Sequence, residues 1–434
     1  MENNSNRRLL FAIGFVLLFA IVIIIWYFFY AKPLIAPTLT ETNNPFPTQN
    51  TPPRFQFLTW GQENTSTTTT EVSDPLLMPL VRVWDKPSTG QTFTVQSILK
   101  EIATTTQQGT STTKVIKTIR ATSTILLFVD RTTGYIYGYP PETGKPFQIS
   151  NTLIPGIYDA YFFEKGARVM MRYIDQEKNI IVGVIAEVPS VQENEMALPL
   201  LNLKYLPSTI TSIATNNKKD KISYVVTKDS GSDIYTLTSK GSTFISSSPF
   251  KEWVLSYGGE TVYATTKPSA YVEGSTFSIP LFQPEVVEKT GLMSTPSFGG
   301  FILNSMWSSQ GLTTFTTNNG DLRTVSFKTL ASKCSWGEKK FLVCAIPRTL
   351  PKSTEGLPDD WFQGRVSFND DFFVVDTING ESYPLYVFKE EDGVFDVTNI
   401  SIAEGNDLLS FNKKQDASLW LLKTSLITSS LRWE

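Results

Sequence analysis

The chain has 434 residues, of which 38 are basic and 41 acidic, and its formal net charge is -3. No stripe of Lys and Arg is present that could neutralise a phosphate backbone, so nucleic acid is not expected as a partner. The sequence contains no histidine, which excludes Ser-His-Asp and Cys-His catalysis and any zinc or haem site ligated by histidine.

Residues 9–31, LLFAIGFVLLFAIVIIIWYFFYA, contain no charged side chain. As a helix this run would extend about 34 Å, enough to cross the hydrocarbon core of a membrane. Two arginines precede it, and Trp26, Tyr27 and Tyr30 stand at its far end, which predicts a cytosolic segment at 1–8 and a body outside the cytoplasm. A cleavable signal peptide is the alternative, but its apolar region is usually about 7–15 residues long. We therefore expect an uncleaved, single-pass signal anchor.

Residues 32–80 form a segment rich in Pro, Thr and Asn, with the stretches TQNTPPR and NTSTTTTE. Such a composition cannot bury enough apolar surface to offset the loss of chain entropy on folding. The sequence therefore predicts a disordered linker between the membrane anchor and the body at 81–434.

One type of strand recurs along the body at intervals of about 40 to 50 residues, the length of a four-stranded propeller blade. Its copies are YIYGYP, NIIVGV, DIYTLT, TFSIPL, DLRTVS, DFFVVD and SLWLLK, whose second positions are Ile136, Ile180, Ile234, Phe277, Leu322, Phe372 and Leu419. Short runs rich in Val, Ile, Phe, Tyr and Thr surround these copies, as expected for antiparallel strands. We take each copy to mark one blade.

Two segments, 210–241 and 397–424, share a layout of strand, polar turn, strand, polar turn, strand. This layout resembles the TolB-like branch of the WD-repeat β-propellers, and the resemblance covers residues 81–434. It implies an all-β fold, with seven blades by the number of markers and six or eight as alternatives. The turns TNNKKDK and IAEGND only approximate the family's Asp-Gly turn, and the resemblance implies no ligand.

Ring closure in such a fold usually requires one terminus to lend a strand to the blade at the other end. Residues 79–85, PLVRVWD, could add to the last blade, whose outer strand is expected at 425–433. The first blade would then use TFTVQS, STILLFVD, YIYGYP and KPFQIS, with 98–121 as an insertion.

Cys334 and Cys344 lie in KCSWGEKKFLVCAIP, a pattern of strand, tight turn and strand that could place them opposite each other. In an oxidising compartment they would form a cross-strand disulfide, and otherwise they would be two buried thiols. Two thiols alone cannot close a zinc site.

The sixth blade carries a long insertion between its second and third strands, at 347–370, which includes the aspartate-rich stretch LPDDWFQGRVSFNDD. Loops between these strands share a face with the connections between blades. The loops at 228–232 and 266–274 should open on the same face. We therefore expect a candidate binding face at Tyr271, Asp359, Asp360, Trp361 and Phe362.

Two interpretations of the aspartates remain. Asp359 and Asp360, with Asp370 and Asp371, could be the acid and base of a glycosidic cleavage, which requires two carboxylates at a set separation. Alternatively, the aspartates form turns, and Trp361 and Phe362 hold the loop against the blade. We favour the second interpretation.

No calcium loop, phosphate loop or dinucleotide fingerprint is present in the sequence, so neither a metal nor a cofactor is expected. The predicted function is a membrane-tethered, extracytoplasmic β-propeller that acts as a protein- or glycan-binding scaffold in the cell envelope. The alternative is an extracytoplasmic carbohydrate-active enzyme that uses the paired aspartates.

Overall fold

A computed structural model describes residues 78–108, 111–193, 195–297, 299–337, 341–352, 356–377 and 380–426, with the backbone alone at 97–121. The chain divides into two compact units, Met1–Thr70 and Glu71–Glu434, and every described residue belongs to the second. The expected anchor at 9–31 and nearly all of the expected linker lie outside the described residues. Within the described part of the chain, no helix has the length and apolar character that crossing a membrane would require.

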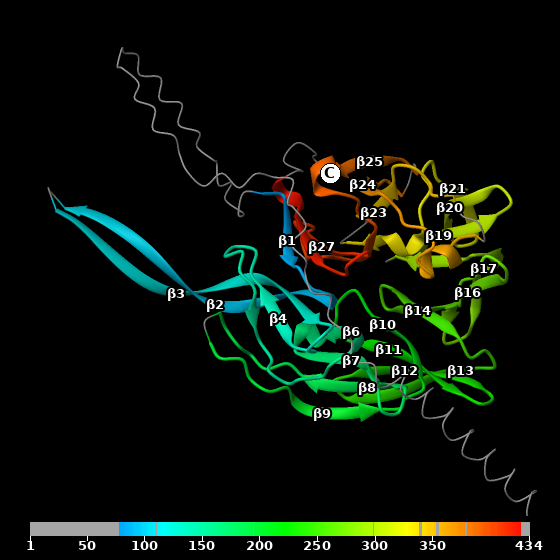
Figure 1. Cartoon of the computed structure of the whole chain (residues 1–434), viewed down its shortest axis with the longest axis horizontal. Coiled ribbons are helices and arrows are strands. Elements are labelled where there is room, and N and C mark those ends of the chain that lie inside the picture. The colour runs from blue at the N-terminus through cyan, green and yellow to red at the C-terminus, as the bar shows by residue number, and fades with distance from the viewer. Residues whose placement is uncertain are drawn as a thin grey trace, which may run out of the picture. The chain divides into compact units, whose positions relative to one another are not determined.

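The described residues form seven antiparallel sheets of four strands each, which stand as blades in a ring (Figure 1). Blade 1 consists of β2 (Ser88–Gln108), β3 (Ser111–Asp130), β4 (Ile136–Tyr139) and β5 (Phe147–Gln148). Blade 2 consists of β6 (Ile157–Phe163), β7 (Arg168–Asp175), β8 (Ile180–Glu187) and β9 (Leu201–Leu206). Blade 3 consists of β10 (Ile210–Thr215), β11 (Ile222–Lys228), β12 (Gly231–Thr238) and β13 (Gly241–Ser248). The predicted all-β propeller with seven blades is confirmed.

Blades 4 to 7 continue the same order around the ring. They consist of β14 (Trp253–Gly258), β15 (Thr261–Thr266), β16 (Glu273–Ile279) and β17 (Gln283–Thr290); β18 (Met293–Pro296), β19 (Phe301–Ser308), β20 (Gly311–Asn318) and β21 (Asp321–Thr324); β22 (Cys334–Trp336), β23 (Leu342–Pro347), β24 (Asp370–Val375) and β25 (Ser382–Tyr386); and β26 (Val397–Ile402), β27 (Leu408–Lys413), β28 (Leu419–Lys423) and β1 (Leu80–Trp84).

Six of the seven marker strands are the third strand of their blade, and the marker at Leu322 is an exception. Leu322 lies in β21, the fourth strand of blade 5, and the third strand is β20. A two-residue turn at Asn319 and Gly320 joins these strands, both in the left-handed region at φ 49° and 89°. The tight hairpin places a strand of similar pattern directly after the third strand. The copy at Leu322 therefore marks blade 5, as predicted, but lies in its fourth strand.

The ring closes through β1, which comes from the N-terminal side of the body and pairs with β28 in blade 7. Leu80 pairs with Leu422 and Val81 with Leu421, so β1 is itself the outer strand. The prediction that 79–85 joins the last blade is confirmed, and β1 takes the outer place that was expected for 425–433. Residues Thr424–Leu426 form a 3-10 turn, and 427–434 lie outside the described residues.

The hydrophobic core consists of apolar layers between neighbouring blades, because alternate residues of a strand point to opposite faces of its sheet. In β3, Ile125 and Leu127 pack against blade 2, whereas Leu126 and Phe128 pack against blade 7. Each blade is thus buried on both faces only when its two neighbours are present. This requirement explains why the repeats close into a ring.

Blade 1 contains the insertion expected at 98–121, formed by a continuous extension of β2 and β3. The two strands stay paired from Ser97 and Thr122 out to Gln108 and Ser111. Figure 1 shows this two-stranded ribbon projecting from the ring.

Candidate functional site

The insertion of blade 6 runs from the end of β23 at Pro347 to the start of β24 at Asp370, as the sequence predicts. Its centre is a single helical turn, α2 (Asp359–Phe362). The carbonyl of Asp360 closes this turn by accepting hydrogen bonds from the backbone N–H groups of Arg365 and Val366. The insertion is therefore a folded element that can hold side chains in fixed positions.

Asp359 ties the insertion to blade 4. Its Oδ2 accepts a hydrogen bond of 2.5 Å from the backbone N–H of Ala270, in the connection between β15 and β16. Asp360, the next residue, is fully buried, and its Oδ1 lies 3.3 Å from the Arg365 guanidinium. The two neighbouring carboxylates thus have separate structural partners.

Trp361 is the residue that anchors the insertion. Its side chain is 6% exposed and packs in an apolar cluster with Leu357 and Phe368, and its indole N–H lies 3.1 and 3.0 Å from the two carboxylate oxygens of Asp396. Phe362, by contrast, is 54% exposed. The expectation that both aromatic side chains hold the loop against the blade applies to Trp361 alone, because successive residues of a helical turn point in different directions.

Two exposed aromatic residues lie close in sequence to the contact between the insertion and blade 4. Tyr271 is 64% exposed and directly follows Ala270, whereas Phe362 lies three residues after Asp359 on the same helical turn. Val272, also exposed, extends the apolar character of this region. We name Tyr271, Val272 and Phe362 the insertion face. Of the five residues predicted for the binding face, Asp360 and Trp361 are buried.

Lys333, which the sequence analysis did not single out, lies at the base of the insertion and is fully buried. Its ammonium nitrogen is 2.8 Å from Oδ2 of Asp370 and 2.5 Å from Oδ1 of Asp396. It also lies over the rings of Trp361 and Phe368, at 5.1 and 4.8 Å from their centroids. No local signal could have identified this cluster, because its members come from three separate elements.

The two carboxylates that contact Lys333 are in different electrostatic environments. Asp370 is fully buried, and burial raises its pKa to about 6 despite the nearby ammonium. Its Oδ1 accepts no hydrogen bond among the described residues. Asp396 accepts hydrogen bonds from the Trp361 indole, the Ser367 hydroxyl and the Phe368 backbone.

Asp371, next to Asp370, accepts a two-pronged contact from Arg348, with both nitrogen–oxygen distances at 2.8 Å. The backbone N–H of Phe388 donates to the same carboxylate at 2.9 Å. The hydrogen bonds to Asp371 raise the pKa of Arg348. All four aspartates of the acid and base hypothesis therefore hold protein groups, and the geometry favours the structural interpretation of this stretch.

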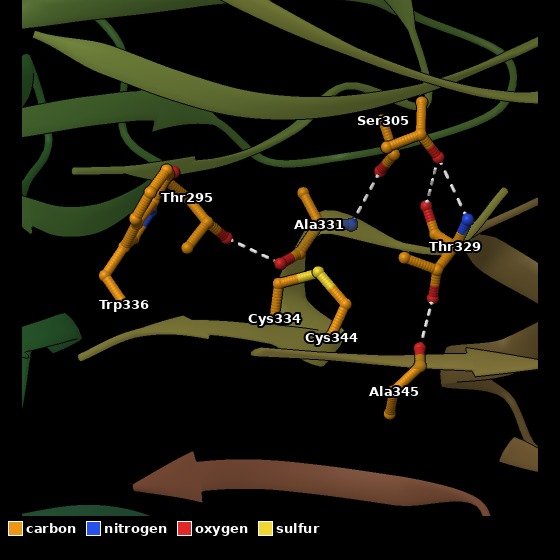
Figure 2. The surroundings of a disulfide bond; sticks show 9 residues. Thr295, Ser305, Thr329, Ala331, Cys334, Trp336, Cys344 and Ala345 are labelled. Carbon is orange, nitrogen blue, oxygen red and sulfur yellow. Dashed lines mark hydrogen bonds between the residues drawn. A yellow bond between two sulfur atoms is a disulfide. The ribbon is translucent and has the colours of Figure 1, made fainter. Parts of the chain in front are cut away.

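Cys334 and Cys344 are opposite each other in the β22–β23 pair, and a disulfide joins them. Figure 2 shows the connection from β21 to β22 beside it, with Ala331 donating its N–H to the Ser305 hydroxyl and Thr329 donating its hydroxyl to the carbonyl of Ala345. These bonds join the connection to blades 5 and 6, and they fix the backbone immediately before Lys333.

Comparisons with known proteins assign the chain to no family. No protein-family model matches the chain, and no curated protein matches it in sequence. The chain is similar to the β-propeller domain of the Trilobed protease from Pyrococcus furiosus, with a TM-score of 0.44 and 10% identity over 69% of this chain and 91% of that chain. It is also similar to the oligogalacturonate lyase VPA0088 from Vibrio parahaemolyticus, with a TM-score of 0.45 and 9% identity over 78% of this chain and 98% of that one.

A third similar structure is the β-propeller domain of Cps50 (Swd1) from Myceliophteria thermophila. The TM-score is 0.40 and the identity 8%, over 69% of this chain and 93% of that chain. The seven four-stranded sheets themselves define a seven-bladed β-propeller, a fold whose members commonly serve as binding scaffolds. At these identities we carry no substrate or partner over from the similar structures.

Proposed function

We propose that this protein is a membrane-tethered, extracytoplasmic β-propeller that binds a protein partner through its insertion face. The observation that carries the proposal is the support beneath the exposed rings of Tyr271 and Phe362. Asp359 joins their two loops, and the buried Trp361 fixes the helical turn. Exposed aromatic rings on a rigid base are typical anchors of protein interfaces, because little side-chain freedom is lost on binding.

The polar groups near the insertion face favour a protein partner over a glycan. A sugar presents many hydroxyl groups, and each requires a hydrogen-bond partner when it is buried. The carboxylates of Asp359, Asp370 and Asp371 instead hold protein groups. The exposed side chains of the insertion face are largely apolar, as expected at the centre of a protein interface.

The proposed location depends on residues 9–31, whose uncharged apolar run is long enough to span a bilayer. The disulfide supports the same location, because disulfides persist mainly in oxidising compartments outside the cytoplasm. Protease added to intact cells should release the body by cutting the segment at 32–77. A body that stays protected until the membrane is broken would contradict the proposed topology.

The partner should be lost when the insertion face is made polar. We expect the full chain, isolated from its native membrane, to retain one specific protein, and the double variant Tyr271→Ser/Phe362→Ser to lose it. The matched control is Tyr205→Ser/Phe244→Ser, which removes two aromatic rings of similar exposure from the outer strands β9 and β13. Equal retention by both variants would exclude the insertion face, and retention of a glycan in place of a protein would contradict the proposed partner.

A further inference from the structure

We propose that Lys333 and Asp370 form an intramolecular amide bond, with Asp396 as the catalytic carboxylate. This covalent modification is independent of the proposed function, since it concerns the interior of blade 6 and not the insertion face. It rests on the convergence of one amine and two carboxyl groups in a fully buried position.

The geometry brings the reacting groups into contact. The Lys333 nitrogen lies 2.8 Å from an oxygen of Asp370, so the Asp370 carboxyl carbon is one bond further away. The backbone carbonyl of Val397 accepts a third hydrogen bond from this nitrogen, at 2.9 Å. The three reacting side chains belong to the 3-10 turn η4 (Ala331–Lys333), to the start of β24 and to the connection between β25 and β26. Groups held in contact by a rigid fold react at high effective concentration.

The surroundings favour the uncharged electrophile that amide formation requires. Burial disfavours a carboxylate, and it raises the pKa of Asp370 to about 6. The Trp361 and Phe368 rings cover Lys333, and exclusion of water protects the product from hydrolysis.

The environments of the two carboxyl groups assign their roles. Asp370 is the group that becomes protonated, because burial raises its pKa and its Oδ1 accepts no hydrogen bond among the described residues. Asp396 accepts hydrogen bonds from Trp361, Ser367 and Phe368. Its carboxylate also contacts the Lys333 nitrogen, so it is placed to take the proton that leaves this nitrogen.

The step balances without any further reactant. Asp396 takes one proton from the Lys333 ammonium, and the neutral amine attacks the carboxyl carbon of protonated Asp370. A carbon–nitrogen bond forms. A second proton passes from the nitrogen through Asp396 to the departing hydroxyl, and the carbon–oxygen bond breaks to release one water molecule. The products are an amide, whose remaining N–H can donate to the Val397 carbonyl, and a protonated Asp396.

The amide would complement the disulfide of the same blade. The disulfide joins β22 to β23, whereas the amide would join the residue preceding β22 to the first residue of β24. The insertion lies between β23 and β24. The disulfide would then hold β23, and the amide would hold the first residue of β24.

Mass spectrometry of the full chain tests the proposal directly. After denaturation and reduction of the disulfide, the mass of the wild-type chain is compared with that of the Lys333→Met variant. Once the mass difference due to the substitution itself is subtracted, the wild-type chain should be lighter by one water molecule. Proteolysis should release a branched peptide that joins Lys333 to Asp370. An ion pair alone would not survive denaturation, so linear peptides with unmodified Lys333 in the wild-type digest would overturn the proposal.

Two further variants test the assigned roles. Asp396→Asn should abolish the loss of water, because the proton acceptor is removed while amine and electrophile remain. Lys414→Arg is the matched control and should retain the full loss, since the Lys414 nitrogen lies 4.9 Å from the Trp361 ring centroid but donates to a backbone carbonyl. A branched peptide that joins Lys333 to Asp396 would overturn the assignment of the electrophile.

Discussion

The indole of Trp361 donates its N–H to both carboxylate oxygens of Asp396, which lies 35 residues further along the chain. This contact joins the insertion of blade 6 to the connection that leads into blade 7. The same carboxylate contacts Lys333. The buried carboxylate of Asp396 therefore helps to fix the helical turn that carries the exposed Phe362.

We expect Trp361→Phe to lower the free energy of unfolding by about 1–3 kcal/mol, because a buried carboxylate loses a hydrogen-bond donor while most of the ring packing is retained. Urea unfolding of the full chain measures this change. The neighbouring Phe362→Leu should alter stability by about 0.5 kcal/mol or less, since the side chain is exposed. Equal effects of the two substitutions would show that Trp361 does not anchor the insertion.

Because β1 closes the ring, a charged side chain at a buried position of β1 should strongly lower the stability of the body. Val83 is buried between blade 7 and blade 1, in contact with the cluster that contains Leu126 and Leu419. Val83→Asp should destabilise the body by several kcal/mol, because a carboxylate without a partner would be buried, and thermal unfolding should detect the change. Arg82→Ser, an exposed position on the same strand, should cost about 1 kcal/mol or less. A stable Val83→Asp variant would contradict closure through β1.

The disulfide between Cys334 and Cys344 closes a short loop, with a sequence separation of 10. On the chain-entropy model its loss should lower the free energy of unfolding by about 2–3 kcal/mol. Denaturant unfolding with and without a thiol reductant measures the difference. The double variant Cys334→Ala/Cys344→Ala should show no dependence on reductant, and a wild-type chain that is equally insensitive would show that no disulfide is present.

The lowered pKa of Asp233 predicts that blade 3 contributes to folding stability in a pH-dependent way. Hydrogen bonds from Lys228 and Ser247 hold its pKa below the ordinary value of 3.8. A carboxyl with a lowered native pKa contributes stability that is complete above the unfolded-state pKa and is lost as the pH falls through the native pKa. Asp233→Asn should therefore be less stable than the wild-type chain at pH 7, with a difference that narrows below about pH 4.

Unfolding midpoints at pH 7 and pH 3 test this expectation. Asp229→Asn, at an exposed position in the adjacent turn, is the matched control and should lower stability less than Asp233→Asn at pH 7. A difference between Asp233→Asn and the wild-type chain that stays constant across this range would contradict the assigned role of Asp233.

The architecture could be predicted from the sequence because each blade repeats the same local pattern of strands and turns. Ile136, Ile234 and Leu419 mark equivalent strands since the third strand of a blade is buried on both faces. The pattern failed at Leu322, where the short outer strand β21 follows a two-residue turn. Local hydrophobicity identifies strands but does not give their order within a sheet.

The candidate site was less predictable, because its chemistry depends on contacts between distant segments. The sequence identified the insertion and Trp361 within it. It gave no indication of Lys333 and Asp396, which are 63 residues apart and meet only when blade 6 has formed. Asp396 ends the acidic stretch KEEDGVFD, whose composition is typical of an exposed turn, yet its carboxylate is fully buried.

The most direct test of the central claim is site-specific photo-crosslinking in intact cells. A photoreactive phenylalanine analogue replaces Phe362 in one chain and the exposed Phe244 in another. We expect a covalent adduct with one protein from position 362, absent from position 244 and removed by protease added outside the cell. An adduct of equal yield from both positions, or none from position 362, would contradict it.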